Sequence, residues 1–358
     1  MNPYKNLPER AFWAPAVGRR DKMEINELWD PKFNIKRRHQ VATFGSCFAQ
    51  HIGRALRKRK YHWMQTEPAP GGLSEENAKL FNYEIFTCRT GNIYTVSLLN
   101  QWTRWALGHT EVPAEVFEKD GRFYDPFRPT VEPDGFASEE EMRRSQEATT
   151  EAFGTAIKEA DFFVFTLGLT ESWFHVQNGY EYPMCPGTAA GTFDADLHKF
   201  KNQDYPFIRE TLINTLNMMR QANPSLKFIL TVSPVPLTAT MSGNHVLAAT
   251  VESKSILRAV AGDIAKNFAF EVYFPSFEII SSTPFEGGFY EQNKRSVAPH
   301  GVAHVMDNFF ECLGTKFGSL ELAKPSASNE VVEETDSEDD VVCDEEFLET
   351  FAPNQVAS

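Results

Sequence analysis

The sequence places a hydroxyl and a thiol side by side where an apolar run gives way to a helical pattern. The run Val41–Gly45 has the β-branched and aromatic residues of a buried strand, and Ser46 and Cys47 follow it directly. From Phe48 onward, apolar residues recur at helical spacing, which predicts an amphipathic helix with Cys47 in its first turn. Backbone N–H groups and the helix dipole stabilise a thiolate at such a position, and they can also hold an oxyanion. Either residue at this corner could therefore be a nucleophile.

Both residues also have purely structural interpretations. Ser46 stands where a helix N-cap is common, and its hydroxyl would then be used by the backbone. Cys47 would be a small buried side chain, which is the commonest role of a free cysteine. Cys47 is favoured over Ser46 as the nucleophile because the helix terminus acts on the thiol, and both alternatives stay open.

The segments that would position this corner alternate between strand-like and helix-like patterns. Short runs rich in β-branched and aromatic residues, typical of strands buried on both faces, lie at 161–168, 227–234 and 270–280. Periodic segments predict helices at 138–160, 208–223, 247–268 and 301–318. This alternation predicts an α/β fold with a parallel, doubly wound sheet, in which ligands bind beyond the carboxyl ends of the strands. We expect a single domain over residues 1–320, in which residues 57–142 form an insertion over the sheet edge.

Negative charge is concentrated at the C-terminal end. The net charge is −14, and from Glu321 onward 12 acidic residues accompany the single Lys324, so the rest of the chain is close to neutral. Residues 321–358 are too polar to order themselves, which predicts a disordered acidic tail whose EEFLETFA segment could become helical on a protein partner. The one dense basic run, RALRKRK, is typical of a solvated helix face, so we expect no nucleic-acid partner.

Other compositional signals bound the function. Five widely spaced cysteines without a CxxC pair argue against a disulfide framework and against a zinc site. His109, His175 and His198 lack metal-ligand spacing, so no metal and no bound cofactor are expected. The first residues lack a secretory-signal pattern and no apolar run reaches about 18 residues, which predicts a cytoplasmic protein without membrane insertion.

The string GSCFA followed by QHIGRAL resembles the signature of the GSCFA family, which is related to the SGNH (GDSL-type) hydrolases. The resemblance continues through ELWDPKF, TLGLTESW, VSPVPLTAT and KSILRAVAG to GVAHVM, covering residues 1–317. It implies a three-layer α/β/α sandwich with a flavodoxin-like strand order and a nucleophile at the first strand-to-helix corner. Laid on the superfamily string FGDS, Gly45 matches the glycine, Ser46 the aspartate and Cys47 the nucleophilic serine.

The resemblance also implies roles for two further segments. The string GLTE, from Gly168 to Glu171, matches a G-x-N-D block, so Thr170 would supply an oxyanion donor and Glu171 would orient a partner or transfer a proton. The segment RTGNIYT would add the Gly91 N–H and the Asn92 amide to the same hole. As alternatives, Thr170 and Glu171 would cap the following helix, and Gly91 with Asn92 would form a bare turn.

The pattern fails at the superfamily's D-x-x-H block, which supplies the acid and base of a triad. Aligned on Gly301, Asn293 and Ser296 stand at the Asp and His positions, and neither is a general base near neutral pH. His304 and His300 lie nearby, and either could act from a new position because a triad is defined by geometry. His304 is favoured because it belongs to the string GVAHVM. A thiolate nucleophile would tolerate loss of the base better than a serine hydroxyl.

These residues together predict an SGNH-like esterase or O-acyltransferase. The resemblance implies an association with bacterial polysaccharide pathways, so the expected substrate is an acylated glycan or polysaccharide precursor, with acyl-CoA as a candidate donor. The alternative is a catalytically inactive carbohydrate-binding or scaffold protein on the same fold, which the unmatched D-x-x-H block favours.

Overall fold

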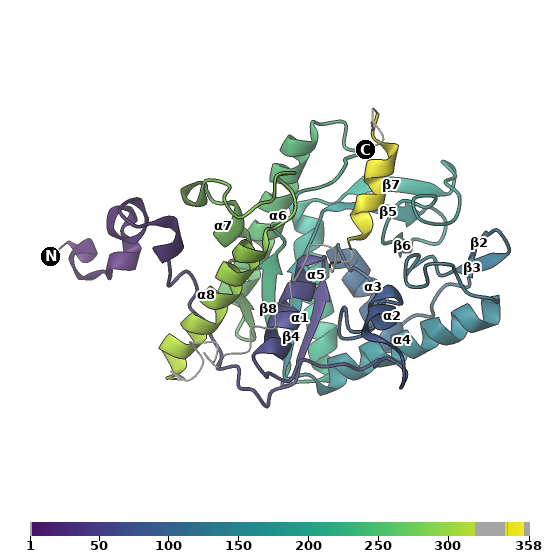
Figure 1. Cartoon of the computed structure of the whole chain (residues 1–358), viewed down its shortest axis with the longest axis horizontal. Helices are drawn as coiled ribbons and strands as arrows, with labels where there is room; N and C mark the ends of the chain where they lie inside the picture. The colour runs from purple at the N-terminus through teal and green to yellow at the C-terminus, as the bar shows by residue number, and fades with distance from the viewer. Residues whose placement is uncertain (1, 319–340, 342, 354–358) are drawn as a thin grey trace. The chain divides into compact units, whose positions relative to one another are not determined.

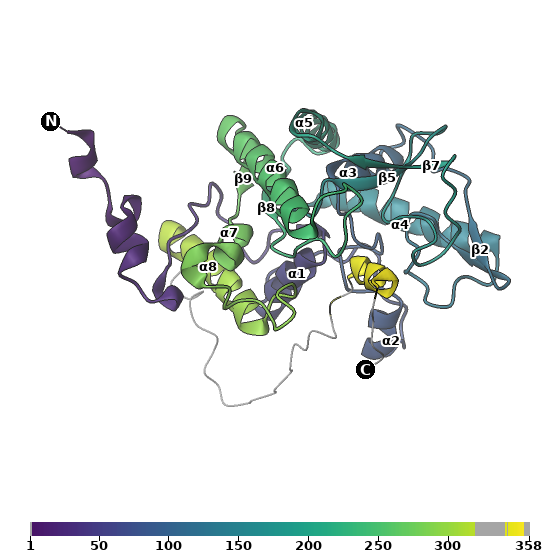
Figure 2. The same ribbon diagram turned by 90° about the horizontal axis from the view of Figure 1, so that it is seen from above.

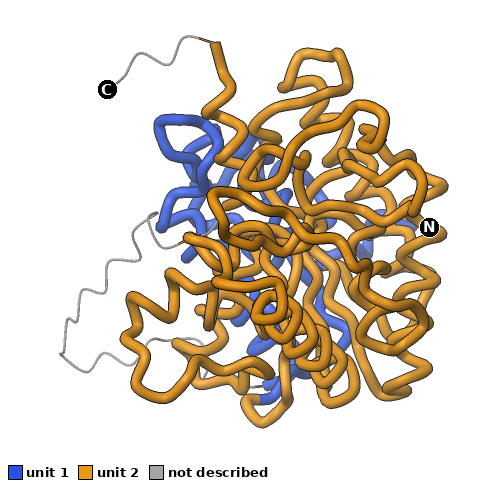
Figure 3. The backbone as a smooth tube through the Cα atoms, turned by 90° about the vertical axis from the view of Figure 1, so that its right-hand side faces the viewer, with its two compact units in different colours: residues 1–36, 274–338 blue, residues 37–273, 339–358 orange. Residues whose placement is uncertain are grey.

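The computed structural model describes residues 2–318, 341 and 343–353. They belong to two compact units (Figure 3): one comprises residues 1–36 and 274–338, and the other comprises residues 37–273 and 339–358. We call these the smaller and the larger unit and describe each by itself.

The larger unit is built on a parallel four-stranded sheet in the order β1-β4-β8-β9 (Figure 1). Its strands are β1 (Val41–Gly45), β4 (Phe162–Leu167), β8 (Lys227–Val232) and β9 (Glu271–Tyr273). Register runs from Val41 opposite Phe162 to Gly45 opposite Thr166, so the carboxyl ends of β1 and β4 coincide. The predicted parallel α/β fold is confirmed.

The far side of β1 carries a single parallel bridge between Val41 and Trp63. The Val41 N–H donates to the His62 carbonyl at 3.0 Å, and the Met64 N–H donates to the Val41 carbonyl at 2.9 Å. Counting this short segment as a strand position gives the flavodoxin-like order 2-1-3-4-5 that the resemblance implies. The order in which strands are added to the sheet therefore reverses between β1 and β4. Ligands of open α/β sheets bind at such a switch point.

Helices cover both faces of this sheet (Figure 2). Helix α1 (Phe48–Lys58) packs on the face that carries Thr43: the Trp63 indole N–H donates to Thr43 Oγ1 at 2.8 Å, and a Cβ on Gly53 of α1 would lie 2.6 Å from the Trp63 ring. Successive strand residues face opposite sides, so Phe44 points to the other face. There it contacts Phe153 of α4 (Glu139–Glu159) with ring centroids 4.7 Å apart.

Aromatic side chains form the core on that second face. Phe44, Phe163 and Phe228 come from three adjacent strands, and their ring centroids are spaced 5.1 and 6.1 Å apart. Each buried phenylalanine stabilises the fold by about 1.5–3 kcal/mol. Helices α5 (Tyr205–Ala222) and α6 (Val246–Asn267) complete this layer, as the periodic segments predict.

Additional elements of the larger unit lie outside the central sheet. The region 57–142 contains α2 (Glu75–Leu80), α3 (Val96–Ala106) and an antiparallel hairpin of β2 (Phe117–Lys119) and β3 (Arg122–Tyr124). A second antiparallel sheet in the order β6-β5-β7 is formed by β5 (Glu171–His175), β6 (Glu181–Tyr182) and β7 (His198–Asn202).

Two details of the sequence prediction are wrong. The run 270–280 is not one strand, because β9 ends at Tyr273 and helix α7 (Ser276–Ser281) follows Pro275 in the smaller unit. Proline lacks the N–H that a strand ladder needs. Thr170 and Glu171 do not cap a helix, because Glu171 begins β5 and the next helix begins only at Tyr205.

In its described residues, the smaller unit contains five short helical turns, the helix α7 and the long helix α8. The turns are η1 (Pro3–Asn6), η2 (Glu9–Ala11), η3 (Ala14–Gly18), η4 (Lys22–Glu24) and η5 (Thr283–Phe285), and α8 spans Pro299–Phe317. Trp29 stacks on Phe309 of α8 with centroids 4.9 Å apart, and Phe274 meets both rings edge-on. This aromatic cluster ties the N-terminal turns to α8.

Part of the acidic tail is described. Asp344–Phe351 forms a 3-10 helix, η8, that belongs to the larger unit. Figure 1 shows it in yellow at the end of the sheet toward which the strand arrows point. Residues 321–340, 342 and 354–358 of the tail that was expected to be disordered lie outside the described residues.

Candidate functional site

Gly45 makes the corner after β1 possible. Its φ is +132°, and a Cβ there would lie 2.3 Å from the Thr166 carbonyl oxygen on the adjacent strand. The Ser46 N–H donates to the same oxygen at 3.0 Å. Only glycine allows the chain to leave β1 pressed against β4 in this way.

Ser46 and Cys47 follow at this corner, and both are buried, with 2% and 4% of their surface exposed. Helix α1 begins at Phe48, and Cys47 is its cap residue, with helical backbone angles and no side-chain capping bond. Ser46 does not cap the helix either: its Oγ is buried and has no hydrogen-bond partner among the described residues. The N-cap interpretation of Ser46 is therefore wrong.

The corner after β4, at Gly168, packs against Ser46. A Cβ on Gly168 would be 3.2 Å from the Ser46 Cβ and 3.0 Å from the Tyr94 carbonyl oxygen. That carbonyl accepts the N–H groups of Gly168 at 2.9 Å and Leu169 at 3.1 Å, and the Ile93 N–H donates to the Gly45 carbonyl at 2.8 Å. The ends of β1 and β4 and the segment before α3 thus converge at the switch point.

Thr170 and Glu171 lie just beyond this convergence, and their polar atoms are engaged elsewhere. The Thr170 hydroxyl donates to Asn202 Oδ1 at 2.6 Å, so its proton does not serve an oxyanion in this structure. Glu171 accepts hydrogen bonds from the Thr240 hydroxyl and the Met241 N–H. Partial burial raises the pKa of Glu171, and these two hydrogen bonds oppose that rise.

Helix α6 supports the β4 corner with two side chains that were not singled out from the sequence. The ammonium of Lys254 is buried and donates to the Gly168 carbonyl at 2.6 Å. The neighbouring Ser253 hydroxyl accepts the Thr170 N–H at 3.1 Å. A lysine within an apolar helix pattern, in the string KSILRAVAG, was the available signal.

Gly91 and Asn92 belong to the converging segment, and Asn92 meets the C-terminal tail. The Asn92 side-chain amide donates to Asp344 Oδ2 at 2.7 Å, and the Thr130 hydroxyl donates to Asp344 Oδ1 at 2.7 Å. Neither Thr130 nor Asp344 was predicted, because the bonds to Asp344 span 252 and 214 residues of sequence.

Tyr94 interacts with both the nucleophile corner and the tail. Its hydroxyl is buried and has no hydrogen-bond partner in the described part of the chain. Burial raises the pKa of Tyr94 well above its usual value, and the charges of Cys343, Asp344, Glu345 and Cys47 raise it further. The hydroxyl therefore stays protonated and can act as a donor. Tyr94 lies in the string RTGNIYT, but the sequence alone does not indicate that its hydroxyl is buried.

The predicted histidines belong to the smaller unit. His300 is exposed, and its Nε2 lies 2.7 Å from the Gly288 carbonyl oxygen. His304 is buried in α8 and stacks on Phe289 at 5.0 Å, and burial lowers its pKa. It lines a pocket together with residues of the N-terminal turns, Arg20, Met23, Glu24 and Asn26, and of α8, Asp307, Asn308 and Glu311.

The two residues at the D-x-x-H positions bind one another. The Asn293 amide donates to Ser296 Oγ at 2.9 Å, and the Ser296 N–H donates back to Asn293 Oδ1 at 2.9 Å. These hydrogen bonds hold the turn 293–296 without an aspartate or a histidine, so the two positions supply no base.

Neither a metal cluster nor a membrane span is found in the described residues. Among residues 2–318, 341 and 343–353, no three or more His, Cys, Asp or Glu side chains are placed to bind one ion. Over the same ranges, no helix combines the length and the apolar character needed to cross a bilayer.

The protein is of the α/β class, with a parallel central sheet. The switch point of this sheet carries a buried serine, a cysteine and two close-packed glycines. The family model of the GSCFA family matches residues 40–309, and the chain belongs to that family. Comparisons with curated proteins and with solved structures gave no match.

Proposed function

We propose that this protein is an acyl-handling enzyme, an esterase or an O-acyltransferase, whose nucleophile lies at the corner after β1. The observation that carries the proposal is the buried, unpartnered Ser46 hydroxyl next to Cys47 at the start of α1, on the switch point of a parallel sheet. Native proteins rarely leave a buried hydroxyl unsatisfied, and the ligands of open α/β sheets bind at the switch point where this hydroxyl lies.

Cys47 is the first choice as nucleophile and Ser46 the second. The thiolate of Cys47 attacks the carbonyl carbon of an acyl ester or thioester, and a tetrahedral oxyanion forms. As it collapses, a thioester to Cys47 remains, and the bond to the leaving alcohol or thiol breaks with uptake of a proton. Attack by water then gives the acid, and attack by a sugar hydroxyl gives a new ester; either returns Cys47.

Donors for the oxyanion come from the same corner. Backbone N–H groups at the start of α1 and the protonated Tyr94 hydroxyl are suited to the role, whereas the Thr170 hydroxyl is engaged with Asn202. No histidine of the larger unit is assigned as base, which favours a thiol because it ionises more readily than a hydroxyl. Family membership makes an acylated glycan or polysaccharide precursor the proposed substrate, with acyl-CoA as the proposed donor.

The first experiment is intact-mass measurement after brief exposure to p-nitrophenyl acetate and, separately, to acetyl-CoA. We expect an acetyl adduct on the wild type and on Ser46→Ala that is absent from Cys47→Ala. An adduct lost only in Ser46→Ala would make the serine the nucleophile. Absence of any adduct at this corner with both donors would contradict the proposed activity.

The second candidate function is a carbohydrate-binding or scaffold protein without chemistry. The mutual hydrogen bonds of Asn293 and Ser296 favour it, because they replace the acid and base with a purely structural pair. It predicts no acyl adduct together with chemical-shift changes of the Tyr94 region on titration with an acylated oligosaccharide.

A further inference from the structure

The C-terminal helix η8 is docked in an unusual way. Asp344 is buried, with 4% of its surface exposed, whereas Phe347 and Phe351 of the same helix are 44% and 65% exposed. A segment held by the hydrophobic effect would bury its aromatic rings and expose its acids. The segment therefore docks through its first turn, where Asp344 is buried together with Cys343 and Glu345, each 9% exposed.

The larger unit offers the Asp344 carboxylate a receptor with one donor for each oxygen. The Asn92 side-chain amide holds Oδ2 and the Thr130 hydroxyl holds Oδ1, both at 2.7 Å, and the Asn92 backbone N–H is a third donor. Burial raises the pKa of Asp344, and these hydrogen bonds oppose the rise. All three donors are neutral, so they offset the desolvation of the carboxylate only in part.

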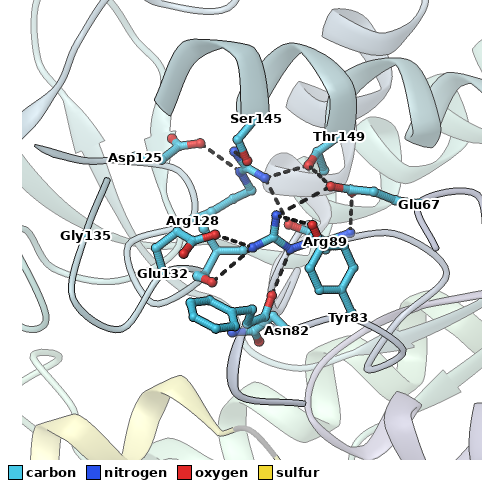
Figure 4. Close-up of polar contacts among 12 residues, drawn as sticks. Glu67, Asn82, Tyr83, Arg89, Asp125, Arg128, Glu132, Gly135, Ser145 and Thr149 are labelled. Carbon is cyan, nitrogen blue, oxygen red and sulfur yellow. Dashed lines mark hydrogen bonds and ion pairs between the residues drawn. The ribbon is translucent and has the colours of Figure 1, made fainter. Parts of the chain in front are cut away.

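Bonds made by Arg89 and Asn82 hold the two chain segments that carry Asn92 and Thr130, and the tail takes no part in them (Figure 4). Arg89 donates to the carbonyls of Phe81 at 2.8 Å and Val131 at 3.3 Å, and it pairs with Glu132 at 2.6 Å. The Asn82 amide donates to the Thr130 carbonyl at 3.1 Å. These bonds hold both the segment leading to Asn92 and the turn at Thr130, and none of them involves the tail.

The receptor shares its surroundings with the nucleophile corner. Tyr94 is two residues beyond Asn92, and its carbonyl accepts the N–H groups of Gly168 and Leu169. The charges of Cys47 at the corner and of Cys343 and Asp344 in the tail all act on its hydroxyl and raise its pKa. Figures 1 and 2 place η8 beside the start of α1 and of α3.

We propose that Asn92 and Thr130 form a carboxylate-binding subsite next to the nucleophile corner, and that Asp344 occupies it as an internal ligand that limits access to the corner. The ligand that displaces the tail carries a carboxylate. This inference rests on the proposed function only in taking the corner as the place where chemistry occurs; the occupancy of the subsite can be tested without any turnover.

The test compares the full-length wild type with Asp344→Ala, Thr130→Val and the control Glu349→Ala, which removes an exposed acid from the same helix. The readout is the rate at which iodoacetamide modifies Cys47, followed by peptide mass mapping. We expect about a tenfold faster reaction in Asp344→Ala and Thr130→Val, the factor that about 1.4 kcal/mol of lost docking energy gives, and no change in Glu349→Ala. Addition of acetate to Asp344→Ala should slow the reaction again as acetate fills the subsite.

A second measurement covers the case in which a substitution disturbs folding. Amide hydrogen exchange at 92–94 in the folded wild type should be slow and should speed up in Asp344→Asn, which keeps the size of the side chain. Equal alkylation rates in Asp344→Ala and Glu349→Ala, or unchanged exchange in Asp344→Asn, would overturn the proposal. Failure of the acyl-adduct experiment would leave these readouts intact, so the two proposals fail separately.

Discussion

At the scale of single residues, the candidate site depends on backbone contacts that tolerate no side chain. The Ser46 hydroxyl is placed by the corner at Gly45, where the chain passes within hydrogen-bond distance of Thr166 on the next strand. Gly168 closes the same point from β4, against Tyr94 and Ser46. The polar groups are thus arranged by the absence of Cβ atoms as much as by hydrogen bonds.

Gly45→Ala should therefore be strongly destabilising. The new Cβ would lie 2.3 Å from a backbone oxygen that cannot rotate away, at a φ of +132° that L-residues avoid. We expect a loss of more than about 3 kcal/mol in the free energy of unfolding, measured by urea denaturation. The matched control is Gly121→Ala in the β2–β3 hairpin, where φ is +72° and no atom lies within 4 Å of the new Cβ; there the loss should be about 1–2 kcal/mol. Equal losses would show that crowding at Thr166 is unimportant.

At the scale of elements, buried ion pairs hold the loops that carry the site. Arg128 and Asp125 are fully buried and joined at 2.7 Å, and Arg128 also donates to the Arg89 carbonyl and the Thr149 hydroxyl (Figure 4). The pair thereby connects the turn before Thr130 to the segment before Asn92 and to helix α4. The receptor for Asp344 is built on this connection.

Replacing Arg128 with methionine should cost about 3–5 kcal/mol of stability, because it leaves the Asp125 carboxylate buried without its positive partner. The control is Arg144→Met on α4, which removes an exposed ion pair with Glu140. That change should alter stability by less than about 1 kcal/mol. Thermal and urea unfolding of both variants measure the difference, and a cost below about 1 kcal/mol for Arg128→Met would exclude a structural role for the pair.

The elements predicted from the sequence are those whose pattern is local. The strands at 41–45, 162–167 and 227–232 consist almost entirely of buried residues, so their apolar runs stand out. The strands β5 and β7, with sequences ESWFH and HKFKN, mix charged and aromatic residues in a separate antiparallel sheet, and no local run identifies them. The Ser46–Cys47 corner could be predicted because strand, glycine and helix are contiguous. The Asn92–Thr130–Asp344 contact could not, since only the folded chain brings these residues together.

At the scale of the whole molecule, stability should depend on one buried acid of the larger unit. Glu181 of β6 accepts hydrogen bonds from the hydroxyls of Thr95 and Ser97 at the start of α3. The side chain of Gln101 in α3 donates to the Glu181 carbonyl and accepts the Glu181 N–H, each at 2.8 Å. Burial raises the pKa of Glu181 from 4.5 to about 7, against the lowering effect of the two hydroxyls and of Lys201.

The sign of the resulting pH dependence follows from proton binding. Between pH 4.5 and about 7 the folded chain keeps the Glu181 proton while the unfolded chain has lost it. This contribution to stability is complete below pH 4.5 and is lost as the pH rises through about 7, amounting to about 3 kcal/mol. Glu181→Gln should remove that slope, because the amide stays neutral at every pH; its oxygen can accept from one of the two hydroxyls and its NH2 group can donate to the oxygen of the other. We expect the unfolding free energy of the variant to equal that of the wild type at pH 5 and to exceed it at pH 8. The control Glu118→Gln, at an exposed position on β2, should follow the wild-type curve. Parallel curves for the wild type and Glu181→Gln across this range would mean that Glu181 is ionised in the folded protein, and that Lys201 and the two hydroxyls outweigh its burial.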